Sequence, residues 1–315
     1  DNAEDLAPST LSLRLNPPPQ QPMTFPITPM KYNGIWWGMH IGTMAWSTND
    51  RDGKPHGATT ANAKKYIDFA AANGLGGTLV EGWNVGWNNE WMREGDKFSF
   101  TQPMPDFNLD TVAAYATSKG VQLIMHNETA TFVENYQRQL DSAFALYRRH
   151  GVRVVKTGYV NDLMQGTGHA HQSQLMVRHH RDVLEAAARY GLSIVMHEPI
   201  KDTGERRTFP NMLSREGARG QEYNAWGEDG GNPPEHETIL FFTRMLAGPM
   251  DFTPGIFDLL VTVGGTRSPR ADTLARPRTT LAKQLALYVV LYSPVQMAAD
   301  LPESYVDNPA FQFIR

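Results

Sequence analysis

Short apolar runs alternate with longer amphipathic stretches through much of the chain. The apolar runs have the length of strands and lie at residues 35–41, 77–80, 121–125, 152–156 and 192–196. The stretches between them predict helices at residues 59–72, 109–118, 132–150 and 172–190, each followed by a glycine turn. Strands that alternate with helices predict a parallel sheet, and nearly continuous apolar strands predict that helices cover both of its faces.

The rest of the chain repeats this alternation less regularly. We expect the sixth strand to end at residues 220–223, the seventh to end at 250–253, and the eighth to span 294–298 after a helix at 280–292. Eight such units in about 270 residues match the size of a (β/α)8 barrel, or TIM barrel. A doubly wound open sheet is the alternative, but no Gly-x-Gly-x-x-Gly motif follows the first strand. The prediction is an α/β protein with a (β/α)8 barrel over residues 31–315.

The first 30 residues follow a different pattern. Residues 11–15 alternate apolar and polar positions as a short strand does, and repeated prolines between residues 17 and 29 prevent further regular structure. The extreme N-terminus lacks the basic and apolar regions of a signal peptide. We interpret residues 1–30 as a linker or the tail of a preceding domain, so the chain is expected to be a piece of a larger protein.

Composition narrows the possible functions. The formal charge of −4 offers no electrostatic reason to expect a nucleic-acid partner. No apolar run approaches the roughly 18 residues of a membrane span, so no membrane partner is expected. The chain has no cysteine, which excludes disulfides, zinc–thiolate sites and a cysteine nucleophile. The absence of cysteine does not identify the compartment.

Polar and charged residues gather at the ends of the predicted strands. In a (β/α)8 barrel, the carboxyl ends of the strands carry the active site. We therefore expect these side chains to converge on one rim, where acids and bases would form a catalytic cleft. The residues at the predicted strand ends are His40, Glu81, His126, Asn127, Glu128, Lys156, His197, Glu198 and Glu222.

Several Glu residues without other catalytic signatures favour glycoside hydrolysis. The chain has no nucleophile elbow, no phosphate loop and no His-Glu-x-x-His motif. Glycosidases use one protonated carboxyl to assist the leaving oxygen and a second carboxylate as base or nucleophile. Trp83 and Trp87 would then stack on sugar rings. Surface Glu residues that only solvate loops are the competing explanation, since charged side chains are mostly exposed.

At these residues the sequence resembles glycoside hydrolase family 97, whose members hydrolyse α-glucosides and α-galactosides and bind a calcium ion in the active site. The resemblance extends from Leu11 to the C-terminus. It implies a (β/α)8 catalytic barrel and a bacterial protein that is periplasmic or secreted. The motifs that carry it are Gly34-Ile-Trp-Trp-Gly-Met-His40, Val80-Glu-Gly-Trp-Asn84, His126-Asn-Glu128, Val155-Lys-Thr-Gly-Tyr159, Met196-His-Glu-Pro199 and Arg215-Glu-Gly-Ala-Arg-Gly-Gln-Glu-Tyr-Asn224.

The resemblance also implies a mechanism. Retaining members of the family are expected to carry an Asp nucleophile at the end of the fourth strand, where this chain has Lys156-Thr157-Gly158. Inverting members instead use Glu residues that match Glu128 and Glu198. By similarity, Glu222 is the general acid, and Glu198 with Glu128 activates the water. The residues that would hold the sugar are His126, His197, Glu81, Lys156 and Trp83.

The same resemblance implies that calcium is held by Glu198 and Glu216, with Glu222 at or near the ion. Calcium prefers six to eight oxygen ligands, so three carboxylates suit it but do not complete its shell. Family members carry a β-sandwich domain before the barrel, which donates one more Glu to the ion, and a small β-domain after it. Both are missing from these 315 residues and are expected to pack on the barrel.

The expected function is an inverting exo-α-glucosidase that acts on α-gluco-oligosaccharides and depends on Ca²⁺. An α-galactosidase of the same family is the alternative enzyme. A non-catalytic module that binds carbohydrate or calcium is the alternative from another class. The retained Glu128, Glu198 and Glu222 favour the enzyme.

Overall fold

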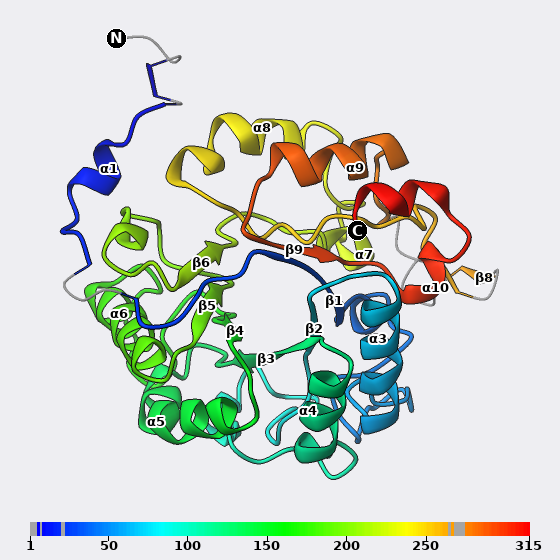
Figure 1. The fold of residues 1–315 in the computed structure, drawn as a ribbon, viewed down its shortest axis with the longest axis horizontal. Helices are drawn as coiled ribbons and strands as arrows, with labels where there is room; N and C mark the ends of the chain where they lie inside the picture. The colour runs from blue at the N-terminus through cyan, green and yellow to red at the C-terminus, as the bar shows by residue number, and fades with distance from the viewer. Residues whose placement is uncertain (1–4, 7, 20–22, 264–265, 268–274) are drawn as a thin grey trace.

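The computed structural model describes residues 5–6, 8–19, 23–263, 266–267 and 275–315. Within these residues, seven parallel strands form one sheet in the order β6-β5-β4-β3-β2-β1-β9, which curls into a nearly closed barrel (Figure 1). The strands are β1 (Met30–Ile35), β2 (Gly77–Val80), β3 (Gln122–Glu128), β4 (Val154–Gly158), β5 (Ser193–Met196), β6 (Met212–Arg215) and β9 (Val295–Ala298). The chain therefore has the predicted TIM-type fold.

The seventh unit contributes less than a regular strand. A parallel bridge pairs Arg215 with Met250, and the amide of Asp251 donates to the carbonyl oxygen of Arg215 at 3.1 Å. At the opposite edge of the sheet, β9 pairs with β1. The antiparallel pair β7 (Thr262–Val263) and β8 (Thr266–Arg267) lies outside the barrel sheet.

Helices surround the barrel (Figure 1). Several begin where the sequence supplies a capping side chain: Thr59, Asn108 and Thr280 each accept a hydrogen bond from an amide in the first turn. No helix in the described ranges is long and apolar enough to cross a membrane. The α-helices are α1 (Leu11–Arg14), α2 (Trp37–His40), α3 (Thr60–Ala72), α4 (Leu109–Ser118), α5 (Val133–Arg149), α6 (Gln174–Arg189), α7 (Tyr223–Trp226), α8 (His236–Phe242), α9 (Leu281–Val290) and α10 (Pro302–Tyr305); the 3-10 helices are η2 (Gly95–Lys97), η3 (Glu205–Arg207), η4 (Arg244–Ala247) and η6 (Pro309–Phe313).

The strands are buried on both faces, which explains their continuous apolar runs. Alternate residues of one strand point to opposite faces of the sheet. In β2, Leu79 belongs to a cluster that takes one or more residues from every barrel strand, whereas Val80 packs with residues of the surrounding helices. The strand-derived members of the first cluster are Tyr32, Leu79, Ile124, Val154, Val195, Leu213, Val295 and Met297.

Two expected elements near the N-terminus are wrong. The first strand lies at Met30–Ile35, and the predicted strand at 35–41 is largely the short helix α2. Residues 11–15, expected to alternate as a strand, instead contain the one-turn helix α1. The segment around α1 lies against the loop after β5, where the Asn16 side chain donates to the carbonyl oxygen of Thr203 at 2.6 Å. An apolar run without a clear period does not distinguish a strand from a buried helical turn.

The sixth strand also ends earlier than expected. It stops at Arg215, so Glu216 directly follows it, whereas Glu222 lies at the start of α7. The predicted strand end at 220–223 is therefore wrong. This shift places both Glu216 and Glu222 in the segment that leaves the carboxyl end of the barrel.

Candidate active site

A cavity of about 560 Å³ opens at the carboxyl ends of the strands. Glu81 directly follows β2, Glu128 ends β3, and Lys156 lies near the end of β4. The structure thus brings together side chains that are far apart in the sequence. The predicted site residues in the wall of this cavity are His40, Glu81, His126, Glu128, Lys156, His197, Glu198, Glu216 and Glu222.

A buried ion pair lies on one side of the cavity. The Lys156 ammonium donates to Oε1 of Glu81 at 2.8 Å, and both side chains are 5% exposed. Burial opposes ionisation of Glu81, but His126 and Lys156 outweigh it and lower the pKa of Glu81 to about 2. Burial lowers the pKa of His126 to about 4, so this imidazole is charged beside Glu81 only in acid; at pH 7 it is neutral and Lys156 supplies the countercharge. This side of the cavity therefore presents a fixed carboxylate, a fixed ammonium and a neutral imidazole.

Glu128 and Glu198 are held by adjacent amides of one backbone segment. The amide of Val160 donates to Oε1 of Glu128 at 3.2 Å, and the amide of Tyr159 donates to Oε2 of Glu198 at 3.0 Å. Ala130 adds a second amide to Glu128 at 2.6 Å. Burial and the charge of Glu198 raise the pKa of Glu128, and burial and the charge of Glu216 raise the pKa of Glu198. Two such carboxyl groups can hold and release a proton near neutral pH.

Gly158, at the end of β4, provides the space that Glu128 occupies. A Cβ atom at position 158 would lie 2.0 Å from Oε2 of Glu128 and 3.4 Å from Nε2 of His126. Any side chain at this position would overlap the Glu128 carboxylate. With the Glu128 carboxylate in this position, the end of β4 has no room for a side chain of its own.

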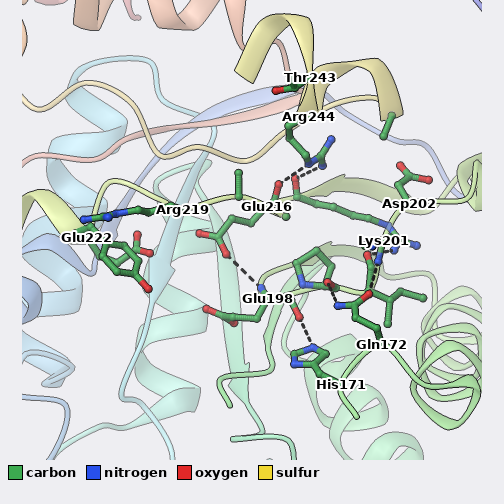
Figure 2. A pocket seen from close by; sticks show the side chains of 17 residues that line it. His171, Gln172, Glu198, Lys201, Asp202, Glu216, Arg219, Glu222, Thr243 and Arg244 are labelled. Carbon is green, nitrogen blue, oxygen red and sulfur yellow. Dashed lines mark hydrogen bonds between the residues drawn. The ribbon is translucent and has the colours of Figure 1, made fainter. Parts of the chain in front are cut away.

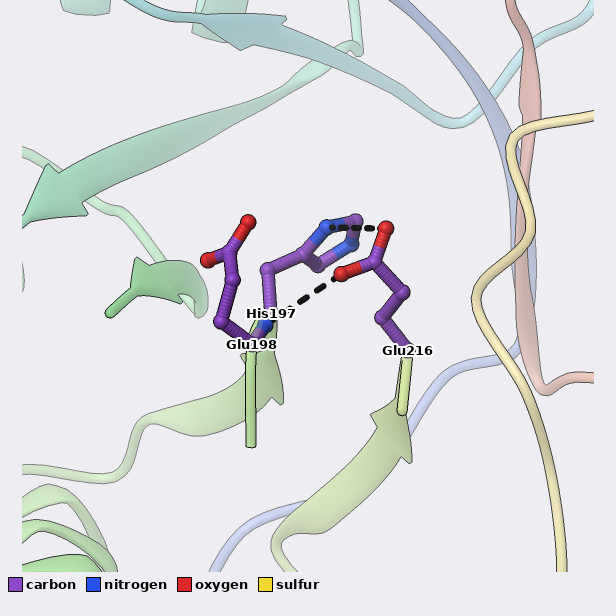
Figure 3. A group of neighbouring side chains, drawn as sticks. All are labelled: His197, Glu198 and Glu216. Atoms are coloured by element: carbon purple, nitrogen blue, oxygen red, sulfur yellow. Dashed lines mark hydrogen bonds and ion pairs between the residues drawn. The ribbon is translucent and has the colours of Figure 1, made fainter. Parts of the chain in front are cut away.

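A second group of carboxylates surrounds the start of the β6–α7 segment. Figure 3 shows Glu198 and Glu216 beside His197 at the ends of β5 and β6, and the amide of Glu198 donates to Oε2 of Glu216 at 3.2 Å. A Cβ atom at Gly220 would lie 2.7 Å from Oε1 of Glu216 and 2.4 Å from Oε2 of Glu222. The carboxylates of Glu216 and Glu222 therefore converge on a position that only glycine leaves open.

These carboxylates separate the first cavity from a second one. The second cavity has a volume of about 740 Å³ and is shown in Figure 2. Glu198, Glu216 and Glu222 line both cavities. Burial, together with the charge of Glu216, raises the pKa of Glu222. Three carboxyl groups that repel one another in this way form a site where a bound cation would relieve the repulsion.

His197 is paired on both sides of its ring. Nε2 lies 2.7 Å from Oδ2 of Asp251, and Nδ1 lies 3.4 Å from Oε1 of Glu216. Burial and the Lys156 charge oppose protonation, but Glu216 and Asp251 outweigh them and raise the pKa of His197 to about 10. The ring is therefore an imidazolium near neutral pH. Its ring also lies close to Glu198 and Glu216, and one potential ligand atom from each of the three residues lies within 4.8 Å of the others.

The sequence also matches a known protein family. The family model described as Glycoside hydrolase 97 matches residues 36–218, which is more than half of the 315 residues and contains β2 to β6 with their strand-end acids. The chain belongs to glycoside hydrolase family 97. The resemblance inferred from the sequence motifs is thereby confirmed.

Two curated relatives carry names that describe α-galactosidases. A retaining α-galactosidase of Bacteroides thetaiotaomicron is 28% identical over 97% of this chain and 42% of its own length. A probable retaining α-galactosidase of Streptomyces bingchenggensis is 28% identical over 82% of this chain and 35% of its own length. The present chain thus spans less than half the length of each of these two relatives.

Solved structures of the family are more similar. A glycoside hydrolase family 97 enzyme from Pseudoalteromonas sp. strain K8, in complex with acarbose, is 53% identical, with a TM-score of 0.89, over 99% of this chain and 47% of that one. A variant of the same enzyme in complex with panose is 52% identical over the same shares. A β-arabinopyranosidase with 19% identity and a TM-score of 0.70 shares the fold.

The aromatic side chains that line the cavity at the strand ends differ from those predicted. Trp83 is fully buried and its indole nitrogen donates to the carbonyl oxygen of His126 at 2.8 Å, so it does not reach the cavity. Gly82, with φ of +81°, turns the chain directly after β2. The indole side chains in the cavity wall are those of Trp36, Trp46, Trp87, Trp91 and Trp226. Trp87 was named with Trp83 as a sugar-stacking residue, and the structure brings Trp87 alone of these two to the wall.

Asp251 is an acid of this site that sequence reasoning missed. It was recognised as part of the seventh strand end but was not counted among the candidate acids. It is 1% exposed, contacts His197, and accepts from the Tyr32 hydroxyl at 3.4 Å. A count of every acid at the eight strand ends would have included it.

Proposed function

We propose that the protein is a calcium-dependent, inverting exo-α-glucosidase that acts on α-gluco-oligosaccharides. The single observation that carries the proposal is the shared space at the end of β4. A nucleophilic Asp at that position would overlap Glu128, but Gly158 leaves the space to the Glu128 carboxylate. A chain that lacks a nucleophile there, and that has Glu128 and Glu198 to activate a water, is suited to direct attack of water on the anomeric carbon.

The general acid in this proposal is Glu222. Its pKa is raised by burial and by Glu216, which keeps a proton available near neutral pH. Glu222 would donate that proton to the glycosidic oxygen while the bond from that oxygen to the anomeric carbon breaks. The leaving sugar departs as an alcohol.

The general base would be formed by Glu128 and Glu198. Adjacent amides orient the two carboxylates, so a water between them can lose its proton as its oxygen bonds to the anomeric carbon. Attack from the face opposite the leaving group converts an α-glycoside into a β-sugar. The proton lost by the water balances the proton given by Glu222.

The donor set of Glu198, Glu216 and Glu222 fits a calcium ion. All three are carboxylates, which are the ligands that calcium prefers, and Glu198 and Glu216 offer ligand atoms that lie within 4.8 Å of each other. Gly220 leaves open the position on which Glu216 and Glu222 converge. When bound, the ion would offset the mutual repulsion of the carboxylates and orient sugar hydroxyls. Because a directly bound carboxylate has a lowered pKa, we expect Glu222 to contact the ion less closely than Glu198 and Glu216.

The sugar would bind through fixed charges and aromatic rings. Glu81 and Lys156 offer an acceptor and a donor whose charges do not change near neutral pH, and His126 adds a neutral imidazole. His197 contributes an imidazolium beside Glu216. Trp87 and its neighbours would pack on the apolar faces of the sugar rings.

The choice of glucosides follows the nearer relatives. The 53% identical enzyme binds acarbose, its variant binds panose, and panose is a trisaccharide of α-linked glucose. The relatives described as retaining α-galactosidases are 28% identical. A retaining α-galactosidase is therefore the second candidate, and the lack of a side chain at Gly158 argues against its nucleophile.

Hydrolysis of p-nitrophenyl glycosides tests the proposal. We expect release of p-nitrophenol from the α-glucoside and little from the α-galactoside. Glu222→Gln should lower turnover of an α-gluco-oligosaccharide, whose leaving sugar needs the proton, by about 10²–10⁴-fold, which is the usual contribution of general acid catalysis. Glu228→Gln is the matched control, because Glu228 is an exposed residue of the same segment. Turnover of the α-galactoside alone would support the second candidate, and turnover of neither would support a binding module.

A further inference from the structure

His171 lies between the two cavities and lines both. It belongs to the loop that leads from β4 to α6. Its Nε2 atom lies 2.7 Å from the carbonyl oxygen of Glu198, and its Nδ1 atom lies 2.7 Å from the carbonyl oxygen of Asn161. Figure 2 shows the ring beside Glu198, with the contact to that residue marked. The imidazole thus joins the β4–α6 loop to the end of β5.

The two carbonyl groups belong to residues with unusual backbone angles. Glu198 has φ of +43° and Asn161 has φ of +113°, although neither is glycine. Side chains with a Cβ atom disfavour this region, and such angles persist where the surroundings hold them. His171 contacts the carbonyl oxygen of each. It therefore restrains both strained residues at once.

The same connection continues to Glu128. The Asn161 side chain donates to the carbonyl oxygen of Ala130 at 2.9 Å. Ala130, with φ of +46°, donates its amide to Oε1 of Glu128 at 2.6 Å. A continuous series of polar contacts thus runs from the Glu128 carboxylate through Ala130, Asn161 and His171 to the backbone of Glu198, and His171 donates to both carbonyl oxygens when both of its ring nitrogens carry a proton.

We infer that His171 is a positioning residue, which fixes the backbone of Glu198 and, through Asn161, the separation of Glu198 from Glu128. This inference rests on the proposed function, in which these two carboxylates activate water. His171 acts through other groups and donates no proton to the substrate. Small displacements of catalytic groups are costly, since a shift of about 1 Å can lower the rate by about 10²-fold.

The test replaces His171 by Ala and Gln and measures kcat and KM with an α-glucoside. We expect kcat to fall by about 10- to 100-fold with KM changed by less than about threefold, because the sugar-binding residues stay in place. Added imidazole should restore part of the turnover of His171→Ala. His169→Ala is the matched control, because His169 is an exposed histidine of the same loop, and it should retain wild-type kcat.

A double-mutant cycle tests the connection to Glu128. If His171 acts through Asn161, the losses of kcat in His171→Ala and Asn161→Ala should not add in the double variant. Additive losses, a change confined to KM, or equal losses in His169→Ala would overturn the inference. So would a lack of rescue by imidazole in a variant that is folded by circular dichroism.

A crystal structure of His171→Ala separates this inference from the proposed function. We expect φ of Glu198 to leave the left-handed region when its carbonyl group loses the imidazole. If the wild-type protein hydrolyses no glycoside, the proposed function fails, yet the backbone change still tests the positioning role. An unchanged Glu198 backbone would refute that role even in an active enzyme.

Discussion

Replacement of Gly158 by Ala perturbs the proposed base without adding a new functional group. The added Cβ atom would lie 2.0 Å from Oε2 of Glu128, a distance that the carboxylate must avoid by moving. The backbone of Gly158 is not among those with positive φ, so alanine introduces no strain of its own. The substitution therefore tests the position of one carboxylate.

The expected loss follows from the contacts of Glu128. Its carboxylate accepts amide hydrogen bonds from Ala130 and Val160, and hydrogen bonds to a charged group contribute about 1.5–3 kcal/mol each. Displacement of this group should weaken one or both bonds and misplace the base. We expect kcat to fall by about 10²–10⁴-fold, which corresponds to about 3–5 kcal/mol of transition-state stabilisation. The free energy of unfolding should fall by only about 1–3 kcal/mol, because the displaced carboxylate can turn toward the cavity.

Steady-state kinetics with an α-glucoside and urea unfolding measure the two losses. Gly76→Ala is the matched control, because its Cβ atom would lie 2.8 Å from Cβ of Met30, away from the cavity. This variant should lose stability and keep kcat within about twofold of the wild type. If Gly158→Ala is stable and keeps wild-type kcat, the assignment of Glu128 to the base is wrong.

Three further predictions concern charge. Lys156→Met should lower the free energy of unfolding by about 3–5 kcal/mol because it leaves the buried Glu81 charge unpaired, and adding Glu81→Gln should recover part of the loss in urea unfolding; additive losses would contradict the pairing. The lowered pKa of Glu81 stabilises the fold at pH above its ordinary value of 4.5, and we expect about 3 kcal/mol to be lost as the pH falls from there through about 2; unfolding curves of wild type and Glu81→Gln that change in parallel over this range would refute it. A calcium chelator should lower both Tm and turnover, and added calcium should restore them, because the ion would bind the folded carboxylate group; the double variant Glu198→Gln, Glu216→Gln should show no such response.

Local patterns predicted the regular elements well. The helix at 59–72 was recognised from its apolar spacing, its Thr59 cap and the following glycine, and α3 spans Thr60–Ala72. Caps and periods act within a few residues, so a sequence displays them directly. The first strand was misplaced because Trp36 and Trp37 are apolar in either a strand or a buried turn. Met250, through which the seventh unit pairs with Arg215, has no periodic pattern to detect.

The strand-end rule located much of the candidate site. It places Glu81, Glu128 and Glu198 together from the sequence alone, because parallel strands present their carboxyl ends on one rim. It could not tell that Trp83 turns into the core, since Trp83 and Trp87 follow the same strand and are the same residue type. Nor could it reveal the role of Gly158, whose lack of a side chain leaves the space that the Glu128 carboxylate occupies.

The anomeric form of the first product tests the central claim most directly. Proton NMR during hydrolysis of a p-nitrophenyl α-glucoside resolves the two anomers before they interconvert. The account predicts that β-glucose appears first and that α-glucose grows in afterward at the rate of spontaneous mutarotation. Appearance of α-glucose as the first product would contradict direct attack by a water held between Glu128 and Glu198.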